Sequence, residues 1–179
     1  MPTWTSPRTW VAGETVTAAQ LNTHIRDNLD FLHSKDHASA YDSTNQSLTT
    51  ATYENVTFDS EHFDSNTMHS TASNTSRIKC NSDGLYLAVF KVTFDTNTTG
   101  IRRVQLRENA AGSDAGGTAR GVWNGPSLSG ENTVIAGSRL CRLNNTDYLE
   151  IFAYQDSGGA LDVVAGTAST WFQLMQLAG

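Results

Sequence analysis

Several features that often reveal a protein's role are scarce in this sequence. Its 179 residues include only three prolines and two cysteines, and charged residues make up 17%. The 12 basic residues are scattered and the formal net charge is -6, which argues against a surface that binds nucleic-acid phosphates. No apolar run is long enough to cross a bilayer, and the N-terminus lacks the apolar core of a secretory signal. We therefore expect a cytosolic product that leaves the cell, if at all, by lysis.

Catalytic signatures are also missing. Neither G-x-S-x-G nor H-E-x-x-H occurs, and the five histidines lie outside the candidate strand-to-loop motifs. One connection is crowded with possible metal ligands: Asp59, Glu61, His62, Asp64 and His69. Their spacing differs from the twelve-residue calcium loop, and acids among Ser and Asn in a loop are usually solvated. The sequence predicts a protein that is not an enzyme and holds no metal or cofactor.

The two cysteines leave two alternatives open. Cys80 and Cys141 fall in candidate strands with no C-x-x-C motif. They would pair across a sandwich if their strands were neighbours, but a chain without an export signal favours buried free thiols.

The N-terminal third has three predicted parts. Residues 1–13 carry two tryptophans and two prolines and should form an extended arm that docks through Trp4 and Trp10. Thr17 and Gln20 form a capping box that starts a helix over residues 18–32. Its apolar residues, with polar Asn28 among them, recur every three or four positions. A helix of about four turns is only marginally stable in isolation. The alternatives are that the helix packs on its own domain or that it attaches the chain to another protein. The second is favoured, through Trp4, Trp10, Leu21, Ile25, Leu29 and Leu32.

Residues 34–52 are polar with few large apolar groups and are predicted to be a spacer between the attachment segment, residues 1–33, and a head domain, residues 53–179. The head has short alternating runs separated by turn residues, which predicts an antiparallel jelly-roll sandwich, mainly β. Strands are expected at 53–58, 77–80, 85–94, 101–107, 133–143, 148–155 and 170–177, with a short one at 160–164 and an exposed loop at 109–121.

The run from Leu85 to Phe94 is apolar on both parities. A strand with one buried face alternates apolar with polar residues, so both faces of this strand need a cover. One sheet of the sandwich covers one face, and another copy of the chain is the simplest cover for the second. The sequence predicts self-association through an interface made of Tyr86, Phe90, Phe94, Phe152 and Tyr154.

Four motifs resemble the trimeric jelly-roll family of complement heads and tumour-necrosis-factor-like ligands. They are D-G-L-Y-L-A-V-F-K-V-T-F (83–94), G-I-R-R-V-Q-L-R-E-N (100–109), N-T-D-Y-L-E-I-F-A-Y-Q-D-S-G-G (145–159) and S-T-W-F-Q-L (169–174). The resemblance covers residues 46–177 and implies a trimeric jelly-roll head. No collagen-like stalk is present, so immune-ligand functions are not carried over.

The segment W-T-S-P-R-T-W-V-A-G-E-T-V-T-A-A-Q-L-N-T-H-I-R-D-N-L (4–29) is similar to the N-terminal segment of tailed-bacteriophage structural proteins. That resemblance implies a virion surface protein bound to capsid or tail proteins, as a capsid decoration protein, a tail-fibre component or another head or tail appendage for host attachment. The alternative is a free trimeric lectin-like module that recognises a host surface glycan or receptor. Neither reading has nucleic acid or a membrane as a partner.

Overall fold

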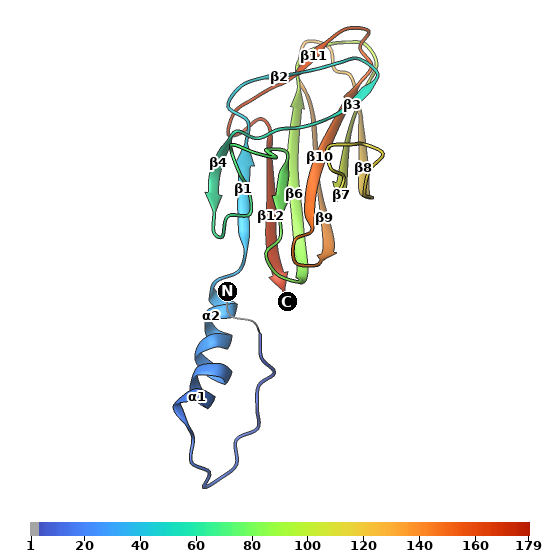
Figure 1. Cartoon of the computed structure of the whole chain (residues 1–179). Helices are drawn as coiled ribbons and strands as arrows, with labels where there is room; N and C mark the ends of the chain where they lie inside the picture. Colours follow the sequence, from blue (N-terminus) through green and yellow to red (C-terminus); the bar gives the residue numbers. More distant parts are fainter. Residues whose placement is uncertain (1–3) are drawn as a thin grey trace. The chain divides into compact units, whose positions relative to one another are not determined.

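The chain forms two compact units in the computed structural model, which describes residues 4–179. The first is Met1–Lys35 with Gly179, and the second is Asp36–Ala178. Figure 1 shows a helix and an extended arm in the first unit, and strands throughout the second. Among the described residues no helix has both the length and the apolar character needed to span a bilayer.

The second unit is a sandwich of two antiparallel sheets (Figure 1). The larger sheet runs β2 (Gln46–Leu48), β11 (Leu161–Val163), β6 (Gly84–Phe94), β12 (Trp171–Ala178), β1 (His37–Tyr41), β4 (Ser60–Asp64), with β9 (Thr133–Leu143) paired to β6. The smaller sheet runs β3 (Thr52–Asn55), β10 (Tyr148–Gln155), β7 (Ile101–Glu108), β8 (Thr118–Pro126), with β5 (Arg77–Lys79) paired to β10. The prediction of a mainly β, antiparallel jelly-roll sandwich is confirmed.

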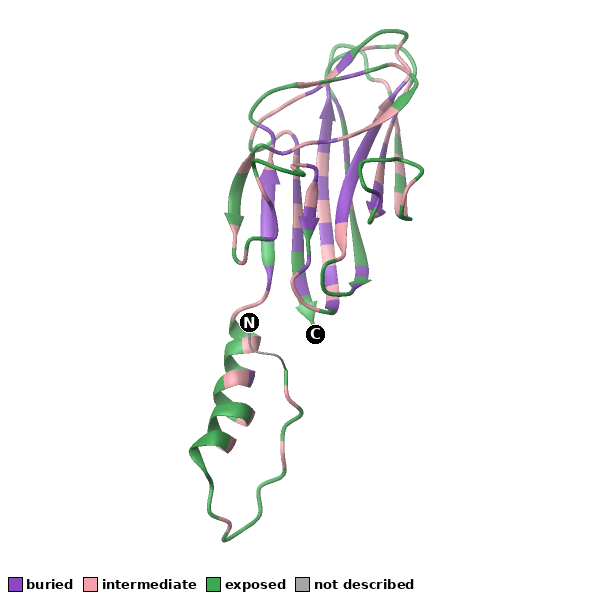
Figure 2. Cartoon of the chain, in the orientation of Figure 1, coloured by how far each residue is buried: buried purple, intermediate pink, exposed green. Residues whose placement is uncertain are grey.

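Strand β6 alternates between buried and half-buried residues along its length, as the purple and pink bands in Figure 2 show. Tyr86, Phe90 and Phe94 are each 0% exposed and belong to the core cluster. Their assignment to a trimer interface is therefore wrong. These rings fill the space between the two sheets because the sandwich needs large side chains to span its interior.

The other two residues of the predicted interface lie on β10, in the smaller sheet. Phe152 is buried within the single chain, so it is also wrong as an interface residue. Tyr154 is half-buried, stacks on Tyr53 at 4.9 Å between ring centres, and has the Arg103 guanidinium 5.4 Å from its ring. The five residues therefore do not form one surface.

The predicted spacer at 34–52 is also wrong, because β1 and β2 lie within it. Ala38, Ala40 and Leu48 are buried in the core. Strand β1 lies between β12 and β4 in the larger sheet, and its alanines belong to the core cluster. The predicted loop at 109–121 is shorter than expected, since β8 begins at Thr118.

The N-terminal helix begins where the sequence predicts. Thr17 Oγ1 accepts from the Gln20 amide at 3.3 Å, and Gln20 Oε1 accepts from the Thr17 amide at 2.9 Å. The helix comprises α1 (Ala18–Leu21), a π-helical turn η1 (Asn22–Arg26) and α2 (Asp27–His33). The wider turn was not predicted, since a five-residue hydrogen-bond step leaves no simple sequence pattern.

Both cysteines are free and buried, as the sequence favoured. Cys80 Sγ donates to the carbonyl oxygens of Asn144 at 2.7 Å and Asp147 at 3.1 Å. Burial raises the pKa of the Cys80 thiol to about 12, so it is protonated at neutral pH and unsuited to nucleophilic chemistry.

A test of the core packing is available at Gly137 in β9. A Cβ there would lie 2.6 Å from the indole of Trp123 and 2.8 Å from the ring of Phe90. We expect Gly137→Ala to lower the free energy of unfolding by about 1–3 kcal/mol, measured by chemical denaturation. Gly125→Ala in β8, where the nearest atom is 3.4 Å from the added Cβ, is the matched control. Equal stability of the two variants would contradict this packing.

Candidate functional site

The face of the larger sheet that points away from the core is rich in apolar side chains. Register pairs place Leu140 of β9 opposite Leu87 of β6, and Leu87 opposite Met175 of β12. This three-strand row is apolar across its width. We define the outer face of the larger sheet by Tyr41, Phe63, Leu85, Leu87, Val89, Val134, Leu140, Trp171, Met175 and Leu177.

Much of this outer face is accessible in the single chain. Leu140 is 53% exposed and Met175 44%, while Leu87 and Val89 are half-buried. The charged side chains on these rows are Lys91, which donates to the Ala168 carbonyl oxygen at 2.6 Å, and Arg142 at one end. Arg139 lines a shallow hollow with Leu87 and Leu140, and polar Ser138 and Gln173 flank Val89. A surface with this many accessible apolar residues among polar ones is typical of an interaction surface. The outer face of the larger sheet is thus a candidate site of self-association.

The second candidate surface lies in the N-terminal unit. Leu21, Ile25, Leu29 and Leu32 recur every three or four residues, and they are 44%, 44%, 61% and 56% exposed. Figure 2 shows the helix mostly green, the colour of exposed residues. We call these four residues the apolar stripe. A short helix with an uncovered apolar stripe needs a partner to be stable.

The arm covers a different side of the helix. Asn28 is the buried residue of α2: its Oδ1 accepts from the Thr5 amide at 2.9 Å, and its Nδ2 donates to the Thr5 carbonyl oxygen at 2.8 Å. Trp4 contacts Phe31 with ring centres 6.0 Å apart, and Trp10 contacts His24 at 6.4 Å. The sequence placed Asn28 within the stripe, but in the structure it holds the arm. The stripe therefore stays free while the arm is docked.

Both arm tryptophans keep part of their surface accessible, Trp4 at 46% and Trp10 at 39%. Arg8 lies 4.6 Å from the Trp10 ring and forms an ion pair with Glu14 at 2.9 Å, which fixes the bend of the arm. All six residues predicted to attach the chain to a particle are thus accessible, and their partner stays a prediction.

The residues weighed as metal ligands are engaged with other groups. Asp59 accepts from Ser43, Asp64 from the Met68 and His69 amides, and His69 Nδ1 contacts Glu61 at 2.9 Å. Over residues 4–179 no three His, Cys, Asp or Glu side chains lie close enough to hold a metal ion.

Comparison with solved structures bears on the fold. The chain is similar to the globular domain of zebrafish complement 1qA protein, with 15% identity, a TM-score of 0.56, and 80% of this chain and 98% of that chain covered. It is also similar to murine APRIL, with 9% identity and a TM-score of 0.61, and the match covers 80% of this chain and 99% of that chain. Eiger TNF from S. frugiperda is 13% identical, with a TM-score of 0.59, and the match covers 81% of this chain and 94% of that chain. No protein-family model matches the chain, and no curated protein matches it in sequence.

The class that the fold defines is therefore the jelly-roll domain found in complement heads and tumour-necrosis-factor-like ligands. The sandwich begins at Asp36, so the N-terminal unit is not part of the jelly-roll domain. At these identities the likeness establishes the fold alone.

The sequence prediction missed the outer face because it placed Tyr86, Phe90 and Phe94 on the outside of β6, whereas the alternate residues face outward. One signal was available: the outward parity carries Leu85, Leu87, Val89 and then Lys91, whereas the inward parity has no charge from Tyr86 to Phe94. A lysine near the end of one parity indicates the side that reaches solvent.

The arm provides a test of the N-terminal unit. Asn28→Ala removes the two hydrogen bonds to Thr5, each contributing about 1 kcal/mol, so we expect the arm to detach more often. Cleavage by trypsin after Arg8, followed by mass spectrometry, should become roughly thirtyfold faster. Thr23→Ala, at an exposed position of the same helix, should leave the rate unchanged. An unchanged rate in Asn28→Ala would show that Asn28 does not hold the arm.

Proposed function

We propose that this chain is a non-enzymatic structural protein of a virion surface, homotrimeric through its jelly-roll head and anchored to the particle by its arm and helix. The observation that carries the proposal is the presence of two uncovered apolar surfaces in two separate units. One surface serves self-association, and the other is left for a different protein.

The outer face of the larger sheet supports self-association. Burial of apolar area stabilises a complex by about 25 cal/mol per Å², and the row Leu140, Leu87, Met175 has no charge to desolvate. The threefold number comes from the resemblance of the head to trimeric families. The sequence argument for self-association placed Tyr86 and Phe90 at the interface, and it fails because both rings are buried in the core. The proposal of self-association now rests on the outer face of the larger sheet.

The N-terminal unit supports attachment. Its apolar stripe and its two accessible tryptophans are the exposed apolar groups of the unit, and aromatic side chains carry much of the binding energy at interfaces. The assignment to a tailed-bacteriophage particle, as a capsid decoration protein or a head or tail appendage, rests on the sequence resemblance of residues 4–29. Capsid or tail proteins are the proposed partners, and the virion surface is the proposed location.

The alternative is a free lectin-like module in which the helix itself holds three copies together. The same apolar stripe favours it, because stripes of this spacing also pack against identical helices. The two readings differ in what removal of the helix does to the oligomer.

Self-association through the outer face is tested by Leu140→Asp. An uncompensated charge buried in an interface costs about 3–5 kcal/mol, so light scattering should show monomers at concentrations where the unaltered chain is trimeric. Val122→Asp, on the smaller sheet and 48% exposed, should remain trimeric. A monomeric unaltered chain, or a trimeric Leu140→Asp variant, would overturn the assignment of this face.

Attachment is tested by deleting residues 1–33. We expect the shortened chain to remain a folded trimer and to be lost from purified virus particles, measured by light scattering and by protein analysis of the particles. In the lectin-like alternative the deletion yields monomers instead. Ile25→Asp with Leu29→Asp should reproduce the loss from particles, whereas Thr23→Asp on the same helix should not.

A further inference from the structure

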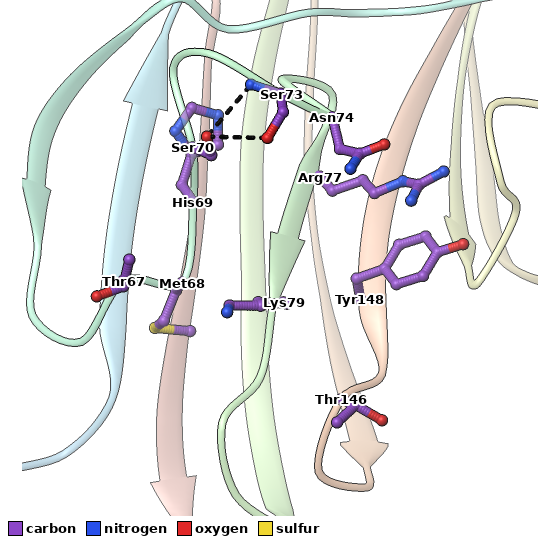
Figure 3. Close-up of a pocket in the computed structure, with 10 residues that line it drawn as sticks. All are labelled: Thr67, Met68, His69, Ser70, Ser73, Asn74, Arg77, Lys79, Thr146 and Tyr148. Atoms are coloured by element: carbon purple, nitrogen blue, oxygen red, sulfur yellow. Dashed lines mark hydrogen bonds between the residues drawn. The ribbon is translucent and has the colours of Figure 1, made fainter.

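A pocket of about 270 Å³ lies in the head beside β5. Figure 3 shows Arg77 and Lys79 projecting from β5, with the loop that carries Thr67 to Asn74 along one side and Tyr148 and Thr146 along the other. None of its lining residues belongs to the outer face of the larger sheet. The pocket is therefore separate from the proposed association surface.

Two cationic side chains line the pocket, Arg77 and Lys79, and no Asp or Glu does. The charge of Arg77 is matched by Glu150, whose Oε1 lies 3.2 Å from Nε, so the unmatched positive charge comes from Lys79. Lys79 is exposed and forms no ion pair within the described chain. A guanidinium and an ammonium group in one concave site suit an anion.

Arg77 is held in place and keeps donors free. Its Nε donates to Glu150 Oε1 at 3.2 Å, and its guanidinium lies 4.4 Å from the centre of the Tyr148 ring. The two terminal nitrogens make no hydrogen bond within residues 4–179. Glu150 itself is fully buried and also accepts from Ser76 Oγ at 2.8 Å. The side chain that presents the charge is thus fixed before any ligand arrives.

The loop that forms one wall is also fixed. The Asp64 carboxylate accepts from the Met68 amide at 3.0 Å and the His69 amide at 2.9 Å. The His69 ring contacts Glu61 Oε1 at 2.9 Å and the Thr75 carbonyl oxygen at 3.1 Å, and its side chain is fully buried. A wall held in this way loses little conformational entropy on binding.

Backbone strain is concentrated at this pocket. Six non-glycine residues have positive φ, and three of them line the pocket: Thr67 at 53°, Asn74 at 50° and Thr146 at 77°. Positive φ is unfavourable for β-branched threonine, at a cost of order 1–3 kcal/mol each, and such strain is typical of functional sites.

The size and lining of the pocket limit the ligand. A cavity of about 150 Å³ holds benzene, so 270 Å³ accommodates one six-membered ring with its substituents. Besides the two cations, the walls carry polar groups that suit a polyhydroxylated ring, on Thr67, Asn74 and Thr146. The hydroxyls of Ser70, Ser73 and Tyr148 also line the pocket, but each already makes a hydrogen bond within the chain.

We propose that this pocket binds a single pyranose ring that carries an anionic group, either a carboxylate or a sulfate ester, with Arg77 and Lys79 contacting the anion. The inference goes beyond the proposed attachment role, because the pocket lies in the head and uses none of the residues assigned to anchoring or self-association.

The test is an NMR titration of the full isotope-labelled chain with glucuronate, glucose 6-sulfate, glucose and acetate. We expect saturable shifts at residues 67–79 and 146–148 with one or both acidic sugars, at a Kd of about 1 mM. Glucose and acetate should each bind at least about tenfold more weakly. The comparison of glucuronate with glucose 6-sulfate identifies which anionic group is preferred.

Lys79→Glu is the decisive variant, because Lys79 is exposed and its replacement leaves the fold intact. Affinity for the acidic sugars should fall at least tenfold. Arg139→Glu, the same change of charge at an exposed residue of β9, should bind as the unaltered chain does. Absence of saturable shifts, equal binding of acetate and glucuronate, or full affinity in Lys79→Glu would each overturn the proposal. Light scattering and particle incorporation of Lys79→Glu report on assembly separately, so failure of the pocket is distinguishable from failure of the proposed function.

Discussion

The structure depends on the requirement that both faces of β6 be covered. Its inward face fills the sandwich with Tyr86, Phe90 and Phe94, and these rings set the spacing between the two sheets. Its outward face adds Leu85, Leu87 and Val89 to apolar neighbours on β9 and β12. Because β6 lies within the sheet, that second face cannot be buried by adding strands, and its residues stay half-buried in the single chain. The proposed self-association would complete their burial.

The fold was largely readable from the sequence. Alternation and turn residues located β6, β7, β9, β10 and β12, because each of these strands is at least eight residues long and is bounded by turn residues. The strands that escaped prediction carry weaker signals. Strand β1 buries Ala38 and Ala40, whose small size resembles a linker, and β8 contains two glycines, at 121 and 125. Their place in the sheets is set by long-range pairing, which composition does not reveal.

The candidate surfaces were readable only in part. The helix and its capping box were located, since the residues that form them are neighbours in the chain. The π-helical turn was not, and it leaves Leu29 exposed and Asn28 against the arm. The parity of β6 was assigned the wrong way round because large aromatic rings suit an interface as well as a core. The pocket beside β5 brings residues 67–79 together with 146–148, a proximity that exists only once β5 pairs with β10.

The connection between the two units has a mechanical consequence. The helix ends at His33 and β1 begins at His37, so only three residues connect the two elements. Strand β1 is hydrogen-bonded on both sides, to β12 and to β4. A pull along β1 would therefore be resisted by two ladders at once, with the hydrogen bonds sharing the load instead of opening one by one. Force applied to the N-terminal side of β1 would therefore enter the larger sheet one strand in from its edge, without first unravelling the edge strand β4.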